Sequence, residues 1–526
     1  MEYADRRRTM GFESILDLKE PVKGLTEPAF FLDLNIDQIL ERVTLGNRRI
    51  RAYYEYFPLD AECSEYRRHI YRDICIKGLS EALTKYVDNY TEFRELERKK
   101  KETRGDIQKT VWNIYAIKLY TENLLGLYDD LKAASPESEG MNALLSYLGN
   151  TVSSEDFKDK CERARTLSAE LDALDVRVTY EKGRVSVDVS DKTDKAKDDD
   201  DEDKPSYATY EEFLNFFDKD NEEEFVNPFA KVFELTGFEQ EVVKVVSKRI
   251  PDWFKKAEKL YDDCSEFEDA CYSRLADELA FYLSFYEFET KTEALGMVFS
   301  EPECDSSKKI EAEGLYDLAL ALVNHDKGKI VVSNDFYYDV NDLFFVLTGP
   351  NQGGKTTFAR SLGQLVYFSM MGLRVAAKKA NVHWFSDILT HFSVEESVES
   401  GRGKLMEELV RLSPMMKHSR DNAFIVINEL FTTAANYDAI IMGKNVLAHF
   451  IEKNCHGIYV THLSELCDTD EHVAGLSAQL DENGIQNFKI LRNKVAYEGC
   501  AENQIKKYKL DYASLSDRLK GIMNRA

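Results

Sequence analysis

The chain has 526 residues, of which 43% are hydrophobic and 12% aromatic, so it contains enough apolar material for several folded domains. Its formal net charge of −26 disfavours a protein that holds nucleic acid through a broadly basic surface, because such binding depends on Lys and Arg neutralising phosphates. A local basic run is present at residues 94–104, where a mixed-charge helix face in solvent is the favoured interpretation.

The cysteines and the N-terminal sequence indicate the cellular compartment of the chain. There are nine cysteines without a C-x-x-C pair, which is typical of reduced thiols in a cytosolic protein and predicts no metal site. The first residues, MEYADRRRTMGFES, contain no apolar signal segment, and no apolar run reaches the roughly eighteen residues that span a bilayer. We therefore expect a cytoplasmic protein with no membrane partner.

Residues 1–170 are predicted to form an N-terminal helical domain. Apolar residues recur there at three- and four-residue spacing, which favours amphipathic helices. The clearest segments are residues 36–56, 66–85 and 107–131.

Residues 171–230 are predicted to form a β-hairpin followed by an acidic disordered tip. Alternating β-branched residues at 175–189 flank Lys182 and Gly183, which is the pattern of a hairpin. Residues 190–204 include DKAKDDDDED, a run too charged to bury, and a solvated linker is favoured over a binding element.

Residues 231–310 are predicted to contain long helices, after a helical pattern that returns from Tyr210. The longest segment covers residues 252–295, and one apolar stripe runs along it (Leu275, Leu279, Tyr282, Leu283 and Tyr286). This pattern fits a rigid arm and an ordinary core helix equally well. Beyond residue 311 the chain changes to short apolar strands that alternate with helices, the pattern of an α/β domain; the predicted strands are 330–332, 343–348, 424–427 and 457–460.

A phosphate-binding loop follows the apolar strand at 343–348. Its sequence, GPNQGGKTT, matches the G-x-x-x-x-G-K-[ST] pattern, in which glycines let backbone N–H groups face phosphate oxygens. Lys355 is expected to reach the β- and γ-phosphates, and the Thr356 hydroxyl to bind Mg²⁺. The predicted nucleotide-binding residues are Gly349, Pro350, Asn351, Gly353, Gly354, Lys355, Thr356 and Thr357.

Two further strands are expected to complete the site. The run FIVI at 424–427 leads to Asn428 and Glu429, and Glu429 is the candidate general base for an attacking water. The strand at 457–460 leads through Thr461 to His462, a candidate contact for the γ-phosphate.

The order of these motifs resembles the ATPase domain of the MutS family, the DNA mismatch repair branch of the ABC-class P-loop ATPases. TGPNQGGKTT is similar to that family's TGPNMGGKST, and SVESGRGKLMEEL is similar to its signature segment, in which an S-G-R turn precedes a helix with Met and Glu. Asn428-Glu429-Leu430 with Tyr437-Asp438, and Thr461-His462 with Glu465-Leu466, resemble two further motifs of the family.

The resemblance implies a fold, cofactors and partners. It implies ATP and Mg²⁺ as ligands, a homodimer in which Ser400 approaches the nucleotide of the other subunit, and helices upstream that clamp DNA. The expected fold is then multidomain: an N-terminal, mainly α part with a β-hairpin, followed by a C-terminal α/β ABC-class P-loop ATPase domain at 311–526. Residues 171–230 would be clamp-like and residues 231–310 lever-like.

Three departures from the family pattern affect these expectations. Asn428 stands where the family has a metal-organising Asp; it is expected to contact the metal through water, and a unit charge about 4 Å away is worth about 4 kcal/mol at an effective dielectric of 20. The family's G-R-G-T-S-T loop is replaced by FTTAAN at 431–436, and the N-terminal G-x-F-[YF]-E segment that reads mismatches is missing. ATP binding is therefore a firmer expectation than turnover, and direct mismatch recognition is not expected.

The leading hypothesis is a nucleotide-gated, dimeric DNA clamp in DNA repair or recombination, driven by a Mg²⁺-dependent ATPase that Asn428 weakens. One alternative is a scaffold that binds ATP to dimerise and hardly hydrolyses it. Another is an ATPase that acts on ribosomes or on branched RNA or DNA.

Overall fold

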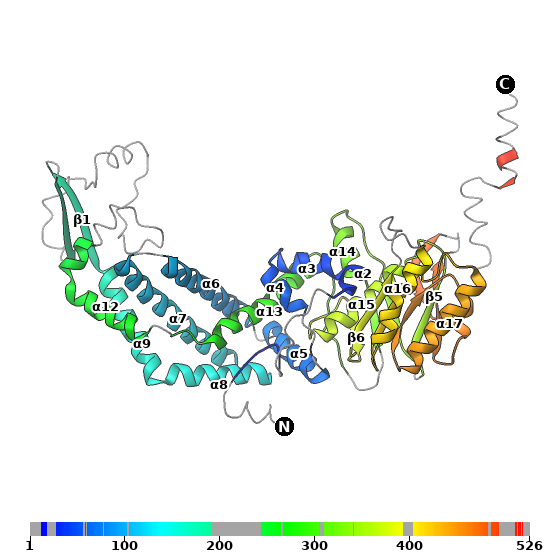
Figure 1. Ribbon diagram of the computed structural model, residues 1–526, viewed down its shortest axis with the longest axis horizontal. Helices are drawn as coiled ribbons and strands as arrows, with labels where there is room; N and C mark the ends of the chain where they lie inside the picture. Colours follow the sequence, from blue (N-terminus) through cyan, green and yellow to red (C-terminus); the bar gives the residue numbers. More distant parts are fainter. Residues whose placement is uncertain are drawn as a thin grey trace, which may run out of the picture. The chain divides into compact units, whose positions relative to one another are not determined.

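The computed structural model describes most of the chain: residues 12–17, 28–55, 58, 60–76, 78–102, 105–181, 184–191, 244–264, 267–304, 310–339, 341–392, 403–481, 485–493, 511–512, 514–516 and 518. The chain forms two compact units, the first from Met1–Ile15 and Arg72–Ala280 and the second from Leu16–Tyr71 and Phe281–Ala526. A mainly helical part is followed by an α/β part with a mixed sheet, as predicted (Figure 1). None of the described helices is long and apolar enough to cross a membrane.

Where its residues are described, the first unit is helical apart from one hairpin. Buried residues of α7, α9 and α12, such as Ile114, Leu171 and Trp253, form its core. Ser154 ends α8 and caps α9, because its side chain accepts a hydrogen bond from the Phe157 N–H. The helices are α6 (Ser80–Glu102), α7 (Asp106–Ala134), α8 (Glu139–Ser153), α9 (Glu155–Asp172), α12 (Pro251–Asp263) and the first part of α13 (Ala270–Ala294).

The predicted hairpin is confirmed. Strand β1 (Leu174–Glu181) pairs antiparallel with β2 (Arg184–Asp191), and Val178 lies opposite Val187. Lys182, Gly183 and the acidic run beyond residue 191 lie outside the described residues.

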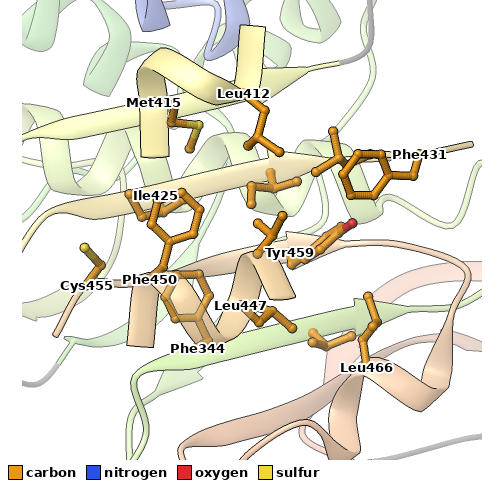
Figure 2. Close-up of a cluster of buried hydrophobic side chains, with 14 of the residues drawn as sticks. Phe344, Leu412, Met415, Ile425, Phe431, Leu447, Phe450, Cys455, Tyr459 and Leu466 are labelled. Atoms are coloured by element: carbon orange, nitrogen blue, oxygen red, sulfur yellow. The ribbon is translucent and has the colours of Figure 1, made fainter. Parts of the chain in front are cut away.

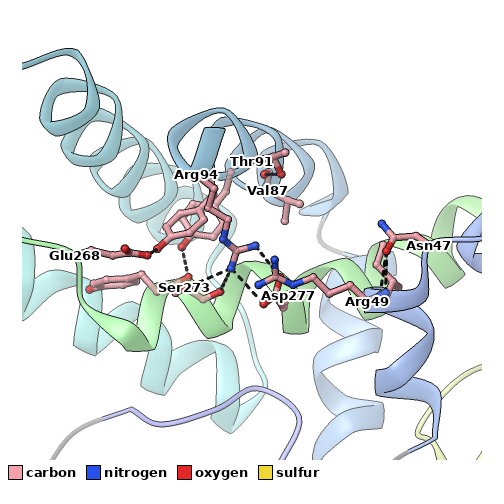
Figure 3. A network of polar contacts seen from close by, with 12 residues as sticks. Asn47, Arg49, Val87, Thr91, Arg94, Glu268, Ser273 and Asp277 are labelled. Atoms are coloured by element: carbon pink, nitrogen blue, oxygen red, sulfur yellow. Dashed lines mark hydrogen bonds and ion pairs between the residues drawn. The ribbon is translucent and has the colours of Figure 1, made fainter. Parts of the chain in front are cut away.

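In the described part of the basic run, residues 94–102, several cations pair with acidic neighbours. The Arg94 guanidinium binds Asp277 at 2.8 Å and donates to the Ser273 carbonyl at 2.6 Å (Figure 3). On α6 itself, Arg98 pairs with Glu95 and Glu102. These ion pairs favour the mixed-charge interpretation over a phosphate-binding patch.

Three long helices expected from periodicity are each broken in two, so those expectations were wrong. Residues 36–56 form α3 (Ile36–Thr44) and α4 (Arg48–Tyr54), because Leu45 and Gly46 take positive φ values of 49° and 75°. Residues 66–85 are divided between α5 (Ala61–Ile76) and α6, with Gly78 at φ 68°. Residues 252–295 are divided between α12 and α13, since α12 ends where Cys264 leaves helical geometry.

The second unit is built on a six-stranded sheet in the order β11-β10-β5-β9-β8-β7. All adjacent pairs are parallel except β10 with β11. The central strands are buried along their whole length, which explains their uninterrupted apolar sequences. The strands are β5 (Phe344–Thr348), β7 (Ile388–Phe392), β8 (Phe424–Asn428), β9 (His456–Val460), β10 (Val473–Leu480) and β11 (Gln486–Leu491).

A three-stranded antiparallel sheet accompanies it, in the order β4-β3-β6. Its strands are β3 (Ile310–Leu315), β4 (Asn334–Tyr337) and β6 (Lys379–Val382). The expected strand at 330–332 does not form. Strand β4 pairs with β3 only from Asn334 onward, where Asn334 lies opposite Leu315. Ile330, ahead of this pairing, is 94% exposed.

Helices cover both faces of the six-stranded sheet. On one face, Leu412 and Met415 of α16 (Lys404–His418) point toward sheet residues that include Ile425 and Tyr459, and α17 (Asn436–Glu452) packs beside them (Figure 2). Phe344 of β5 belongs to the cluster on this first face. Because successive residues of a strand face opposite sides, Phe345 lies on the other face, where it contacts Phe336. Helix α15 (Lys355–Met370) covers that second face.

The start of the second unit packs against α15, which explains why residues 16–71 group with the α/β part instead of with the helical domain expected at 1–170. Leu34, just after α2 (Phe30–Asp33), is fully buried, and a Cβ added at Gly363 of α15 would lie 2.6 Å from its side chain. Gln364 donates to the Leu34 carbonyl at 2.9 Å, and Tyr367 donates to the Tyr54 carbonyl at 2.7 Å.

Candidate nucleotide-binding site

The loop between β5 and α15 has the backbone shape that its glycines predict. Gly349 and Gly354 have φ values of 137° and 87°, a region that side chains disfavour, and a Cβ at Gly349 would lie 2.8 Å from Ala478 Cβ. Helix α15 begins at Lys355, immediately after this turn. The dipole and the backbone N–H groups of a helix N-terminus favour an anion, so this position of α15 favours an anion at the loop.

Lys355 lies inside the loop that precedes it. Its side chain is 5% exposed, and its ammonium donates to the carbonyls of Gly349 and Pro350 at 2.9 and 3.0 Å. These bonds satisfy a buried cation and hold the loop closed around it. A phosphate would offer the same ammonium a charged acceptor.

Thr356 and Asn428 come together from different elements. The Thr356 hydroxyl donates to Asn428 Oδ1 at 2.8 Å. Strand β8 does not pair with β5, because β9 lies between them, yet β5, β9 and β8 end at the same edge of the sheet. Ligands of open parallel sheets bind at this carboxyl edge.

Glu429 and His462 form the second pair of the site. Glu429 follows β8, His462 follows β9, and Glu429 Oε1 lies 3.3 Å from His462 Nε2. The hydrogen bond from His462, with the nearby charges of Lys355 and Lys404, holds the pKa of Glu429 below its usual value despite partial burial. Glu429 is therefore a carboxylate at neutral pH.

One cavity of about 530 Å³ joins these groups. Lys355, Thr356, Glu429 and His462 all line it. Sequence reasoning had identified part of its lining, with Asn351, Gly354 and Thr357 as further members. Gly349, Pro350 and Gly353 shape the loop behind this lining.

Sequence reasoning missed the opposite wall. It consists of the irregular segment 330–332, the start of α14 (Leu318–His325) and Phe488 of β11. Asn334 holds this wall together, since it donates to the Phe488 carbonyl at 3.1 Å and accepts from the Ile490 N–H at 2.8 Å. The apolar run at 330–332 could have indicated this wall, but its sequence had been interpreted as a strand.

Comparison with known proteins gives a family match over this part of the chain. The family model described as MutS domain V matches residues 345–526, which contain the phosphate loop, β8 and β9. This part of the chain is therefore similar to domain V of the MutS family. The matched segment begins at residue 345, within β5, the strand that leads directly into the phosphate loop.

Curated MutS relatives are similar at low identity. A protein named "DNA mismatch repair protein MutS" from Persephonella marina is 23% identical over 85% of this chain and 53% of its own length. Proteins of the same name from Thermotoga sp. strain RQ2 and Listeria innocua are each 24% identical, over 58% and 61% of this chain and 37% and 35% of their own lengths. The chain thus spans about a third to a half of these relatives.

The other MutS-like motifs are only partly described. Ser400, the residue expected to act in trans, lies outside the described residues, as do Gly401 and Arg402. Tyr437 and Asp438 lie in the first turn of α17, and Glu465 lies in a 3₁₀ helix, η4 (Ser464–Asp468).

No described group of three or more His, Cys, Asp or Glu side chains could hold a metal ion by itself. A Mg²⁺ ion at this MutS-like site would depend on the Thr356 hydroxyl, the Asn428 carbonyl oxygen, phosphate and water. Such a ligand set suits Mg²⁺, which keeps several waters and binds few protein groups beside phosphate.

Proposed function

We propose that the chain binds ATP with Mg²⁺ and hydrolyses it, and that nucleotide binding controls a dimeric, DNA-binding clamp. One observation carries the ATPase part: Lys355, the Thr356–Asn428 pair and the Glu429–His462 pair line or border a single cavity at the carboxyl edge of the sheet.

The phosphate loop would hold the nucleotide's phosphates. Backbone N–H groups at the N-terminus of α15 would bind phosphate oxygens, as at other helix N-termini. Lys355 would exchange its two carbonyl acceptors for phosphate oxygens. The base would then extend toward the opposite wall. Val332 and Phe488 offer apolar contact to an aromatic ring there.

Thr356 and Asn428 would hold the metal. Bound Mg²⁺ supplies positive charge that neutralises phosphate oxygens. The Thr356 hydroxyl, which now donates to Asn428, would turn its oxygen toward the metal, while Asn428 Oδ1 would accept from a water. Asn428 is neutral, so it attracts the ion less than a carboxylate would.

Glu429 would orient and deprotonate the attacking water. Its lowered pKa keeps it ready to accept a hydrogen bond or a proton, and His462 restrains the carboxylate from one side. The exposed part of His462 is available to a phosphate oxygen.

The DNA clamp and the dimer rest on the family relationship. The relatives carry the name of a DNA mismatch repair protein, and their similarity extends beyond domain V, since one alignment covers 85% of this chain. We propose that the helical first unit contributes the DNA-binding part, that Ser400 acts at the partner's nucleotide, and that the role lies in DNA repair or recombination.

A second candidate function is an ATP-gated scaffold with little turnover. It is favoured by Asn428, which leaves the metal site without the carboxylate that Mg²⁺ prefers. An ATPase acting on ribosomes or on branched nucleic acid is the remaining alternative.

Steady-state ATP hydrolysis of the purified chain with Mg²⁺ tests these functions, with duplex DNA, branched DNA, ribosomes or no addition. Glu429→Ala is the matched inactive variant, Lys355→Ala is the variant without nucleotide binding, and Glu471→Ala controls for loss of an exposed acid away from the cavity.

DNA-stimulated turnover that Glu429→Ala abolishes would support the clamp. Binding of ATP without turnover, with no effect of any nucleic acid, would support the scaffold. Unchanged turnover in both Lys355→Ala and Glu429→Ala would refute the assignment of the site.

A further inference from the structure

A buried carboxylate on α16 contacts the chain just after Glu429. Glu408 is 4% exposed, and its Oε2 accepts a hydrogen bond from the Phe431 N–H at 3.0 Å. Phe431 follows Glu429 by two residues. Glu408 therefore lies behind the candidate general base, outside the cavity lining, and touches the backbone that carries that base.

The backbone at this point is unusual. Glu429 and Phe431 have φ values of 56° and 64°, in the left-handed region that residues other than glycine rarely adopt. Such conformations persist only where the surroundings enforce them. The turn from Glu429 to Phe431 therefore needs external restraints.

Three restraints are visible. The Glu429 N–H donates to the Val460 carbonyl of β9 at 2.9 Å, which holds the start of the turn. The side chains of Leu430 and Phe431 are buried in the core between the sheet and α16 and α17. Glu408, on α16, holds the end of the turn by accepting a hydrogen bond from the Phe431 N–H.

The charges around Glu408 link it to the same site. Burial raises its pKa, while the Phe431 N–H and the Lys404 ammonium oppose that rise. Lys404 also lowers the pKa of Glu429, so one cation of the first turn of α16 acts on both carboxylates. Within the described part of the chain, Glu408 Oε1 has no hydrogen-bond partner.

We propose that Glu408 is a positioning residue: by accepting the Phe431 N–H it holds the 429–431 turn in the conformation that aims Glu429 into the cavity. This inference rests on the proposed role of Glu429 in hydrolysis. It assigns α16 a role in setting the orientation of the general base, in addition to its packing on the sheet.

Replacement of the acceptor tests this assignment. Glu408→Met keeps the side-chain length and removes the acceptor, Glu408→Gln keeps a carbonyl oxygen, and Glu407→Met changes the neighbouring, more exposed residue as a control. Each variant is assayed in the full chain for kcat and KM of ATP hydrolysis. Hydrogen exchange of peptides that cover residues 428–434 is measured without nucleotide.

We expect Glu408→Met to lower kcat by about ten- to a hundredfold while KM stays within about twofold, since misplacing a catalytic group affects the chemical step. Exchange at Phe431 should become faster. Glu408→Gln should restore both values, and Glu407→Met should resemble the wild type.

Wild-type kcat and wild-type exchange in Glu408→Met would overturn the proposal. An equal loss in Glu408→Gln would also overturn it, because the charge and not the accepted hydrogen bond would then matter. If Glu408→Met lacks a cooperative thermal transition, the Gln variant and Glu408→Ala are compared instead. If the wild type does not hydrolyse ATP, the proposed hydrolysis fails, while the exchange experiment still decides whether Glu408 holds the turn.

Discussion

His462 Nε2 lies 3.3 Å from Glu429 Oε1, and this contact joins the ends of the adjacent strands β9 and β8. The hydrogen bond is the largest cause of the lowered pKa of Glu429. The two residues therefore form one unit, in which the imidazole sets both the position and the basicity of the carboxylate.

This contact predicts how activity depends on pH. A lowered pKa keeps Glu429 ionised, and thus competent as a base, to a pH below the usual glutamate value of 4.5. His462→Ala removes the largest lowering cause and leaves the burial that raises the pKa. We expect the acid-side loss of kcat/KM to move to higher pH in His462→Ala. A pH profile unchanged by His462→Ala would argue against a role for this contact in the proposed hydrolysis.

Asn428 predicts a gain of function. Asn428→Asp keeps the acceptor for the Thr356 hydroxyl and adds a negative charge where a metal would bind. We expect half-maximal activity at a lower Mg²⁺ concentration and ATP turnover that is faster by about tenfold or more. A tenfold increase corresponds to about 1.4 kcal/mol of activation free energy. Titration of Mg²⁺ in the ATPase assay measures both effects. Asn428→Ala, which lacks the acceptor, should lose activity, and a gain in that variant would contradict the assigned role.

The packing of Leu34 predicts that the α/β part needs the N-terminal helices. Leu34 is fully buried against Gly363, so Leu34→Ala should lower the free energy of unfolding by about 2–5 kcal/mol. Leu32, on α2 just before Leu34, is 70% exposed, and Leu32→Ala should change the free energy of unfolding by about 0.5 kcal/mol or less. Urea unfolding of both variants decides the point. A fragment limited to residues 311–526 should fail to fold cooperatively.

A buried histidine predicts acid sensitivity. His391 on β7 is 1% exposed, and burial, with the Arg411 charge, lowers its pKa from 6.5 to about 4. The unfolded chain takes up a proton below pH 6.5 that the folded chain does not, so the folded state loses stability as pH falls toward 4. Between pH 7 and pH 5 the loss should be about 2 kcal/mol. His391→Phe should remove this part of the pH dependence; equal slopes for both proteins would contradict the prediction.

Local motifs made part of the structure predictable. The glycine spacing at 349–354 sets the turn, and short apolar runs that end in polar residues indicated β5, β8 and β9 and the edge at which Thr356, Glu429 and His462 meet. These features depend on neighbours in sequence, which a pattern can register.

The rest depended on contacts between distant segments. Phe488 and the 330–332 segment face the phosphate loop only because β11 and β4 are brought together by Asn334. Leu45 takes a left-handed conformation that leucine rarely adopts, so the sequence did not predict the break between α3 and α4. The grouping of residues 16–71 with the sheet likewise arises from tertiary packing on α15.

The division of the second unit between Leu16–Tyr71 and Phe281–Ala526 has a consequence for synthesis on the ribosome. The first unit's main segment, Arg72–Ala280, is complete before β5 and α15 have been translated. Phe31 and Leu34 therefore emerge early and lack their α15 partners while the intervening residues are made. At about 5–20 residues per second this interval lasts on the order of tens of seconds. During that time these side chains are exposed to chaperones and to aggregation.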